Sequence, residues 1–331
     1  MEQVIIENEK EDLMVVQELK KHFPIKNGVF GKTTGEVKAV DGVSFTVKKG
    51  ETFSIVGESG CGKSTVGMSL LRLTEPTSGK IIFNEENMLD KNRNELRDLR
   101  KNIQIIFQDT YSSLNPKHTI KKIISEPLVI NRKMTNEEME TRVLELLDLV
   151  GLGPHHLYRY PHEFSGGQRQ RIGIARALAL NPQLIVCDEP VSALDVSIQS
   201  QILNLLEELQ KKFNLTYIFI SHDLSVVEHI SDRVAVMYLG RIVEMGSREE
   251  VFQNPQHPYT KALMSSVPIA DPKLKDKKQR IILTGDVPSP KNPPKGCHFH
   301  TRCPFKTEKC AEIYPEYKEI KGDHKAACHI I

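Results

Sequence analysis

Short runs of apolar residues recur along the chain and predict buried strands. The clearest run spans residues 184–187, and similar runs lie at 52–56, 103–107 and 217–220. A parallel sheet is covered on both faces, so its strands carry near-continuous apolar sequence. The pattern therefore predicts an α/β domain.

Alternating and turn-bounded segments add further strands. The first part, from Val4 to about Gln108, is β-rich, with alternation at residues 43–47 and a strand at 81–83 after the turn at 78–80. Residues 233–237 and 241–244 predict a hairpin, whose turn is the dipeptide Leu239-Gly240.

Between residues 109 and 164 the periodicity becomes helical. The sequence Thr135-Asn136-Glu137-Glu138 is a capping box, which satisfies backbone donors at the start of a helix. The residues that follow at helical spacing are Met139, Val143, Leu146, Leu147 and Val150. We therefore expect a helical insertion within the α/β domain. Further helices are expected at residues 168–180 and 198–209.

The last part of the chain differs in composition. Eight of the 18 prolines fall between Pro268 and Pro315, which favours a loop-rich extension over another sheet-and-helix unit. Four of the six cysteines lie in the last 35 residues: Cys297, Cys303, Cys310 and Cys328. In a cytosolic chain such a group favours metal binding over disulfides.

Composition narrows the function classes. The formal net charge of +2 gives no electrostatic case for nucleic acid as a partner. No apolar run approaches the roughly 18 residues of a membrane span. The acidic N-terminus lacks a signal-peptide layout. We expect a cytoplasmic protein, in which other subunits supply the spans if it works at a membrane.

The most specific motif is Gly57-Glu58-Ser59-Gly60-Cys61-Gly62-Lys63-Ser64, which fits the P-loop pattern. A predicted strand precedes it and a predicted helix follows it, an arrangement that aims backbone N–H groups at phosphates. Lys63 can reach the outer phosphates, and the Ser64 hydroxyl can bind Mg²⁺.

Two further motifs fit a nucleotide site. Asp188 and Glu189 directly follow the strand at 184–187, where one carboxylate can hold Mg²⁺ and the other can orient an attacking water. Residues 165–168 are a glycine-containing sequence before a helix, and they predict a second anion-binding helix N-terminus. Two phosphate cradles in one domain imply that two protomers complete each other's sites.

At this point the chain resembles the ABC ATPases, specifically the nucleotide-binding subunits of transporters. Residues 165–168 match the family signature, Gln108 the Q-loop glutamine, residues 192–195 the D-loop and His222 the switch histidine. These motifs occur in family order over roughly residues 35 to 245. The resemblance implies a P-loop α/β fold with a RecA-like core, an antiparallel β-subdomain and a helical subdomain.

The resemblance also implies roles for individual residues. Catalysis is expected of Glu189 as the base, His222 at the γ-phosphate, Gln108 and Lys63. Mg²⁺ would be held by Ser64, Gln108 and Asp188. ATP would be bound by Gly57, Glu58, Ser59, Gly60, Cys61, Gly62, Lys63, Ser64, Thr65, Gln108 and Asp188. Contacts in trans, to the ATP of the opposing subunit, would come from Ser165, Gly166, Gly167, Gln168 and Asp195.

One position departs from the family pattern. The family stacks adenine on an aromatic residue about 23 positions before the P-loop glycine, and the corresponding place here is near Thr34. Phe30 and Val37 are the candidate substitutes, so the adenine contact stays unassigned by the sequence.

Three further stretches resemble the peptide and nickel importer branch: residues 109–116, 254–263 and 297–304. Residues 20–24 and 35–40 resemble the second of the two ATPase subunits of such importers. We therefore expect an ABC ATPase domain at 1–267, with a helical subdomain at about 109–169, and a cysteine-containing extension at 268–331.

The implied function is ATP hydrolysis that drives import of oligopeptides or dipeptides. The implied partners are a second homologous ATPase, two transmembrane permease subunits and an extracytoplasmic peptide-binding protein, which places the chain peripherally on the cytoplasmic face of the cell membrane. Import of nickel or another small solute is the alternative. A DNA-processing ABC ATPase would carry a long coiled coil or zinc insertion in the helical part, and the sequence contains neither.

The cysteine spacing is C-x5-C-x6-C-x17-C, without the C-x2-C pairs of an ordinary zinc ribbon. Relatives are thought to hold a cluster here, and four thiolates suit [4Fe–4S]. A zinc site and the absence of any metal both stay open as alternatives. Four nearby histidines could also join the ligand set: His298, His300, His324 and His329.

Overall fold

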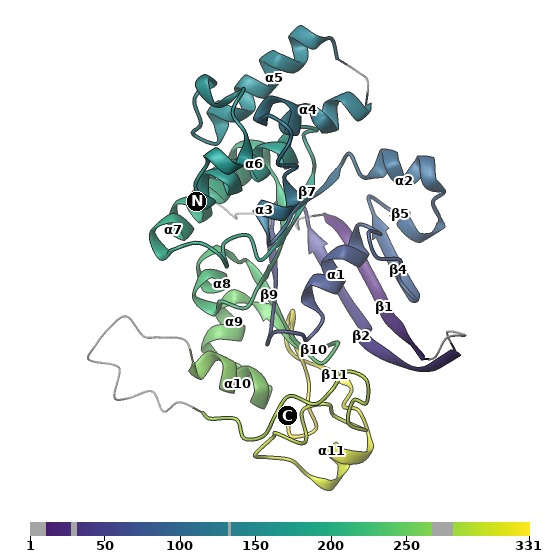
Figure 1. Cartoon of the computed structure of the whole chain (residues 1–331). Coiled ribbons are helices and arrows are strands. Elements are labelled where there is room, and N and C mark those ends of the chain that lie inside the picture. The colour runs from purple at the N-terminus through teal and green to yellow at the C-terminus, as the bar shows by residue number, and fades with distance from the viewer. Residues whose placement is uncertain (1–10, 28–31, 132–133, 267–280) are drawn as a thin grey trace, which may run out of the picture.

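Two sheets and two groups of helices make up the described part of the protein, a computed structural model that describes residues 11–27, 32–131, 134–266 and 281–331 (Figure 1). The larger sheet has the strand order β11-β12-β10-β9-β3-β8-β7-β6. The smaller one is β2-β1-β4-β5. Among the described residues, no helix is long and apolar enough to cross a membrane.

The centre of the larger sheet is parallel, as the apolar runs predicted. Its strands β9, β3, β8, β7 and β6 pair side by side, and the three central ones are buried along almost their whole length because helices cover both faces. The bounds are β3 Thr52–Val56, β6 Ile103–Ile106, β7 Leu184–Asp188, β8 Thr216–Ser221 and β9 Arg233–Tyr238.

The smaller sheet is antiparallel and is dominated by one long hairpin. Its strands are β1 Asp12–Asn27, β2 Lys32–Lys48, β4 Ser78–Phe83 and β5 Glu86–Asn87. Phe45 of β2 stacks on Phe53 of β3 with 4.9 Å between ring centroids. This aromatic pair packs the end of β2 against the start of β3 and so fixes one sheet against the other.

Helices separate into a group around the larger sheet and a group above it (Figure 1). The upper group, here the helical segment (residues 110–178), contains α3 Thr110–Ser113, α4 Ile120–Asn131, α5 Asn136–Leu149 and α6 Gly166–Leu178, with 3₁₀ turns at Pro154–His156 and Pro161–Glu163. The predicted capping box at Thr135 and Glu138 is confirmed at the start of α5.

The other helices cover the sheets. They are α1 Lys63–Leu70, the 3₁₀ turn Met88–Asp90, α2 Arg93–Leu99, α7 Val196–Phe213, α8 Leu224–Ile230, α9 Arg248–Gln253, α10 Pro258–Ser265 and α11 Glu308–Glu312. The amphipathic face of α7 packs its leucines into the largest core cluster, together with the helical segment and β7. One continuous core therefore joins the helical segment to the sheet.

The C-terminal segment (residues 281–331) is mostly loop, as expected, but it also adds two strands to the larger sheet. Strand β10 Arg241–Ser247 forms the predicted hairpin with β9, and β12 His324–Ala327 pairs with β10 through Glu244 and Ala326. Strand β11 Tyr317–Lys321 closes the edge. The sequence prediction missed this second hairpin because every residue of β11 is exposed and polar residues dominate it.

Candidate functional site

The P-loop connects β3 to α1 in a conformation that requires its glycines. Gly57 and Gly62 have φ values of +155° and +108°. A Cβ on Gly57 would lie 2.1 Å from the carbonyl oxygen of Met237, and one on Gly62 would lie 2.1 Å from that of Ala39. No L side chain fits at such a separation. The loop is therefore pressed between β9 and the end of β2.

Lys63 is buried at the centre of this loop, with 4% of its surface exposed. Its ammonium donates to the carbonyl oxygens of Gly57 at 2.8 Å and Glu58 at 3.2 Å. Lys63 is also the first residue of α1, so its ammonium and the N-terminus of that helix lie at the same loop. This is the charge arrangement that an outer phosphate would meet.

Asp188 and Ser64 form the candidate magnesium site. The Ser64 hydroxyl donates to Asp188 Oδ1 at 2.8 Å, across 124 residues of sequence. Burial raises the pKa of Asp188, and the Ser64 hydrogen bond partly offsets that effect. A hydroxyl and a partly buried carboxylate beside the phosphate loop are oxygen ligands of the kind that Mg²⁺ prefers.

Glu189 lies at the meeting point of three elements. It has a positive φ of +46°, and its backbone N–H donates to Ile220 of β8 at 2.9 Å. Its carboxylate accepts from Gln108 Nε2 at 2.8 Å and lies 3.1 Å from His222 Nδ1. The structure thus brings together three predicted catalytic residues that are far apart in sequence.

A cavity of about 480 Å³ joins these groups into one site. Its lining comes from the P-loop, from β2, from the strand ends and from the C-terminal segment, and consists of Val37, Ala39, Ser59, Gly60, Gly62, Lys63, Ser64, Thr65, Gln108, Glu189, His222 and Pro290. Val37, one predicted substitute for the missing aromatic, therefore lies in the cavity. Phe30, the other, falls outside the described residues.

The second predicted phosphate cradle lies elsewhere. Ser165 caps α6 in a reciprocal box with Gln168, the hydroxyl accepting from the Gln168 N–H at 3.3 Å. Asp195 caps α7 beside it, and Gly167 packs so closely on Ile198 that a Cβ would lie 2.4 Å away. Of the described residues that line the P-loop cavity, none comes from 165–168. Within this chain the two cradles do not meet.

Two residues at the site were missed by the sequence prediction. Arg302 donates to both carboxylate oxygens of Glu58, at 2.8 and 3.2 Å, and the guanidinium side chain is 8% exposed. The Glu58 N–H donates to the Tyr259 hydroxyl at 3.0 Å. Both lay within stretches already singled out for their resemblance, 254–263 and 297–304, but no spacing rule links them to a loop about 200 residues upstream.

Cys297, Cys303, Cys310 and Cys328 are neighbours, as the sequence suggested. Burial, together with the nearby thiols, raises the pKa of Cys297 to about 11, and burial and neighbouring thiols also raise the pKa of Cys303 and Cys328. The Cys297 N–H donates to the carbonyl of Cys310 at 2.8 Å. Even so, the described part of the chain forms no group of three or more Cys, His, Asp or Glu side chains that could hold a metal ion.

The strand–P-loop–helix unit, the acidic pair after β7 and the separate capped cradle on α6 define a nucleotide-binding cassette of the ABC class. Solved cassettes agree. CbiO1 from Clostridium perfringens, part of the ABC transporter complex cbiONQ, is 32% identical with a TM-score of 0.63, over 74% of this chain and 92% of that one. The dimeric ATP-binding cassette MJ0796, bound to ADP and Pi, is 29% identical with the same TM-score, over 71% and 98%.

Sequence comparison narrows the class. The ABC transporter family matches residues 40–192, and the oligopeptide/dipeptide transporter C-terminal region matches residues 243–310. The oligopeptide transport ATP-binding protein AppF of Bacillus subtilis is 57% identical over 97% of this chain and 98% of its own length. The dipeptide transport ATP-binding protein DppF of Haemophilus influenzae is 53% identical over 94% of both, and OppF of Salmonella typhimurium 53% over 92% of both.

The chain belongs to this family, the ATP-binding proteins of oligopeptide and dipeptide ABC transporters. It is an ATPase of the transport-coupled kind, which binds ATP and Mg²⁺. The fold expected from the motifs is confirmed by the solved cassettes.

Proposed function

We propose that this chain hydrolyses ATP to drive import of oligopeptides or dipeptides through a membrane transporter. The observation that carries the chemistry is the convergence of Ser64, Asp188, Gln108, Glu189 and His222 around one cavity beside Lys63. The names of the relatives supply the cargo class.

Each residue has a task that follows from its contacts. Lys63 would neutralise phosphate oxygens, while Ser64 and Gln108 would hold Mg²⁺ and Asp188, which accepts from Ser64, would support the metal. The Glu189 carboxylate accepts a proton from the attacking water, and His222, 3.1 Å away, touches the γ-phosphate. Gln108 Nε2 donates to the Glu189 carboxylate at 2.8 Å, so the proposed metal ligand and the proposed base are in direct contact.

The cradle on α6 acts on a different nucleotide. Ser165, Gly166, Gly167, Gln168 and Asp195 lie outside the P-loop cavity, which supports contact in trans with the ATP of a partner ATPase. The solved MJ0796 cassette is a dimer, which is consistent with that arrangement. A second homologous subunit of the same importer is the proposed partner.

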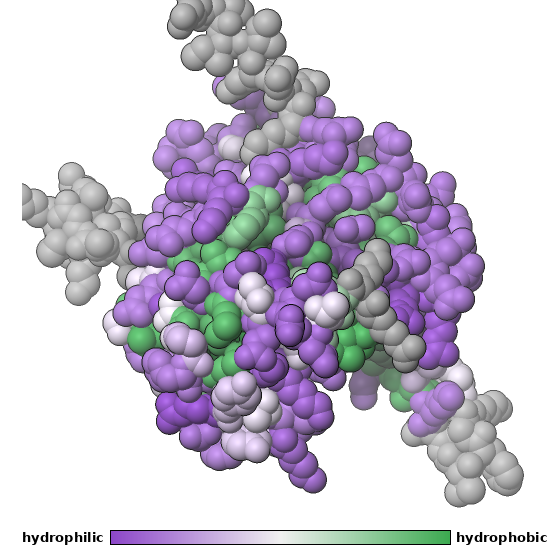
Figure 2. Space-filling view, turned by 90° about the horizontal axis from the view of Figure 1, so that it is seen from above, coloured by the Kyte–Doolittle hydropathy of each residue, from purple (hydrophilic) through white to green (hydrophobic). Residues whose placement is uncertain are grey.

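A groove of about 450 Å³ is the proposed contact with the permease subunits. It lies between α2, β6, α4 and α6, and its lining includes the cations Arg97, Arg100, Lys101 and Arg176. Val129 and Ile130 of α4 are each 52% exposed beside it. Figure 2, a view onto the end of the molecule that carries α4 and α5, shows hydrophobic patches within a mostly hydrophilic surface. Such a mixed groove suits an amphipathic helix.

The relatives, which are transport ATP-binding proteins, support a wider assembly. Two permease subunits would span the membrane, an extracytoplasmic peptide-binding protein would deliver cargo, and this chain would sit peripherally on the cytoplasmic face. We assign residues 1–267 to the ATPase domain, with the helical subdomain at about 109–169, and 268–331 to the extension.

The four clustered cysteines are the proposed site of a [4Fe–4S] cluster, with zinc as the alternative. The thiols of Cys303, Cys310 and Cys328 each raise the pKa of Cys297, which supports a shared site, although the described residues form no group of three or more side chains already arranged to hold a metal ion. Burial raises the pKa values of Cys297, Cys303 and Cys328, so these thiols would lose protons as they bind a metal. A bound cluster would cross-link the four cysteines of this segment, and oxidants would destroy that cross-link.

Uptake measurements test the function directly. Cells that lack the chain but carry its partner subunits should regain uptake of a labelled tripeptide when the wild-type chain is supplied, and should stay at background with Lys63→Ala. Lys211→Ala, which removes an exposed lysine on α7, is the matched control and should behave like wild type. Restored uptake of labelled nickel with no gain for peptides would overturn the peptide assignment and favour the nickel alternative.

A further inference from the structure

The nucleotide cavity has an apolar part that the P-loop does not provide. Its lining side chains with neither charge nor polar groups are Val37, Ala39 and Pro290. The first two lie on β2, on either side of Lys38, and the third comes from the C-terminal segment, some 250 residues later. A nucleotide presents a charged triphosphate and a flat base, so the apolar part of its cavity is the natural surface for the base.

Pro290 is held directly against β2. The Lys38 N–H donates to the Pro290 carbonyl at 3.1 Å, which holds residue 290 beside the part of β2 that carries Val37 and Ala39, and all three residues line the cavity. The following turn is closed by hydrogen bonds from the Asn292 N–H to the Ser289 carbonyl at 3.1 Å and from the Lys291 N–H to the Ser289 hydroxyl at 3.3 Å. A proline with fixed φ in such a turn presents its ring with little freedom.

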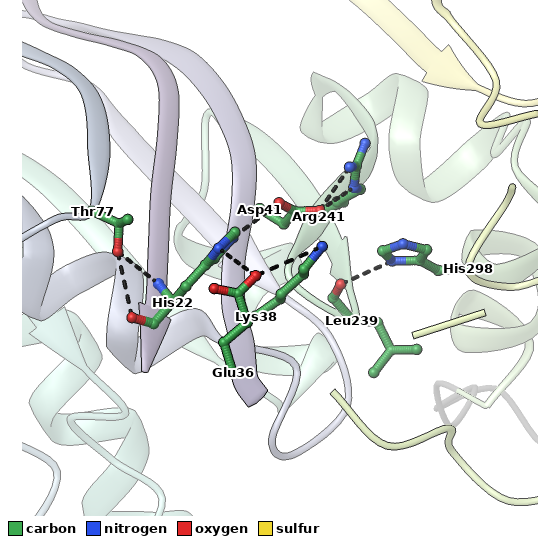
Figure 3. A network of polar contacts seen from close by, with 8 residues as sticks. All are labelled: His22, Glu36, Lys38, Asp41, Thr77, Leu239, Arg241 and His298. Atoms are coloured by element: carbon green, nitrogen blue, oxygen red, sulfur yellow. Dashed lines mark hydrogen bonds and ion pairs between the residues drawn. The ribbon is translucent and has the colours of Figure 1, made fainter. Parts of the chain in front are cut away.

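The same segment is fastened on the other side of the P-loop. His298 is 7% exposed, and its Nδ1 donates to the Leu239 carbonyl at 3.1 Å, a contact that Figure 3 shows next to Lys38. Arg302 forms its two hydrogen bonds to Glu58 four residues later. The Phe299 ring packs edge-on against Tyr238 at 5.3 Å. Pro290 thus belongs to a segment that three further residues, His298, Phe299 and Arg302, hold against the surroundings of the site.

The strand β2 itself offers no aromatic ring at the family's adenine position. Thr34 stands there, exposed, and its hydroxyl donates to the Ile25 carbonyl at 3.4 Å. The apolar wall formed by Val37, Ala39 and Pro290 therefore lies where a base-packing surface is otherwise missing among the described residues.

We infer that Pro290 packs against the nucleotide base, so that the C-terminal segment completes the ATP site of its own chain. The inference rests on the proposed ATPase function and names a residue of that same site. A proline ring contacts a base through dispersion alone, because it has no side-chain hydrogen-bonding group. This apolar wall therefore contacts the face of a purine ring and does not distinguish the hydrogen-bonding groups of adenine from those of guanine. Pro290 should contribute equally to the binding of ATP and GTP.

The test compares a ligand that has a base with one that lacks it. Calorimetric titration of the full chain with MgATP, MgGTP and magnesium tripolyphosphate should show that Pro290→Gly weakens both nucleotides about fivefold, the effect of uncovering roughly 40 Å² of apolar surface. Tripolyphosphate affinity should not change, since Lys63 and the P-loop amides alone bind it. Pro294→Gly, in the same segment but outside the cavity lining, is the control and should match wild type for every ligand.

Wild-type affinity for ATP in Pro290→Gly would overturn the inference. An equal loss for tripolyphosphate would also overturn it, because the proline would then act by holding the P-loop and not by touching the base. A wild-type chain that binds neither nucleotide would instead remove the proposed ATPase function, an outcome that the unmodified protein reports before any variant is made.

Discussion

At the scale of single residues, the proposed base Glu189 shows how the fold orients one carboxylate. Its φ of +46° is uncommon for a residue with a side chain, and the contact of its N–H with Ile220 fixes the backbone in that conformation. Gln108 and His222 then hold both carboxylate oxygens. Backbone and side-chain contacts together therefore fix the direction of this carboxylate.

We expect Glu189→Gln to bind MgATP like wild type and to hydrolyse it roughly 10²- to 10⁴-fold more slowly, because the amide keeps the shape but cannot take a proton from water. Phosphate release measured in parallel with nucleotide binding checks this. The ATP-bound variant should also accumulate as a closed dimer with its partner ATPase.

The matched control is Glu207→Gln on α7, which removes a partly exposed carboxylate that pairs with His229. Its hydrolysis rate should equal that of wild type. Wild-type turnover in Glu189→Gln would show that another group is the base.

At the scale of elements, the start of α10 depends on a buried polar cluster. Glu244 of β10 is fully buried and accepts from the backbone N–H groups of Gln256 and His257 at 2.7 and 2.8 Å, while His324 of β12 lies 2.8 Å from the same carboxylate. The His257 ring caps α10 by accepting from the Tyr259 N–H at 3.1 Å. A single carboxylate thus ties α10 to two strands.

Burial lowers the pKa of His257 to about 3, so the folded chain keeps this ring neutral. The unfolded chain binds a proton near pH 6.5, and stability is therefore complete above that pH and falls on acidification, by about 1.4 kcal/mol per pH unit between 6.5 and 3. Urea unfolding at pH 7.5 and 5.5 should show this loss for wild type. His257→Asn, which can still cap the helix, should lose less stability between the two pH values.

His229→Asn is the control for that comparison, since this histidine is 56% exposed on α8. It should keep the wild-type difference between pH 7.5 and 5.5. An unchanged difference in His257→Asn would assign the acid sensitivity to another group.

At the scale of the whole molecule, the sequence predicts what is locally encoded. The strand–loop–helix around residues 57–64, the hairpin at Leu239-Gly240 and the capped helix at Thr135 each follow from neighbouring residues, and the structure contains all three. The pairing of Gln108 with Glu189 needed the family resemblance as well, because 81 residues separate the two.

The sequence does not predict contacts between segments that lie far apart in the chain and lack a periodic or motif-like pattern. Arg302 reaches Glu58 across 244 residues, and Pro290 reaches Lys38 across a similar distance. Neither end carries periodicity or a spacing rule, so only the folded chain reveals the pair. The adenine-binding surface remained unassigned for the same physical reason.

Metal content tests the C-terminal segment as part of the whole. Anaerobically purified protein should contain about four irons per chain and absorb near ~400 nm, and both signals should fall sharply in Cys303→Ser. Cys187→Ala, in the buried strand β7 and away from the tail, should keep both. One zinc per chain without colour would replace the cluster by the zinc alternative, and no metal would remove the site.

Strand β12 has a consequence for how the protein is made. The ribosome releases residues 324–327 after every other strand of the larger sheet, yet they cover the edge of β10 and bring His324 to the buried Glu244. Until translation reaches them, β10 presents an open edge and a carboxylate without its imidazole partner. A chain stopped short of β12 therefore carries a complete P-loop together with an adhesive sheet edge. Removal of β12 should therefore expose the β10 edge to pairing with other chains, which increased aggregation of a variant that lacks residues 324–327 would reveal.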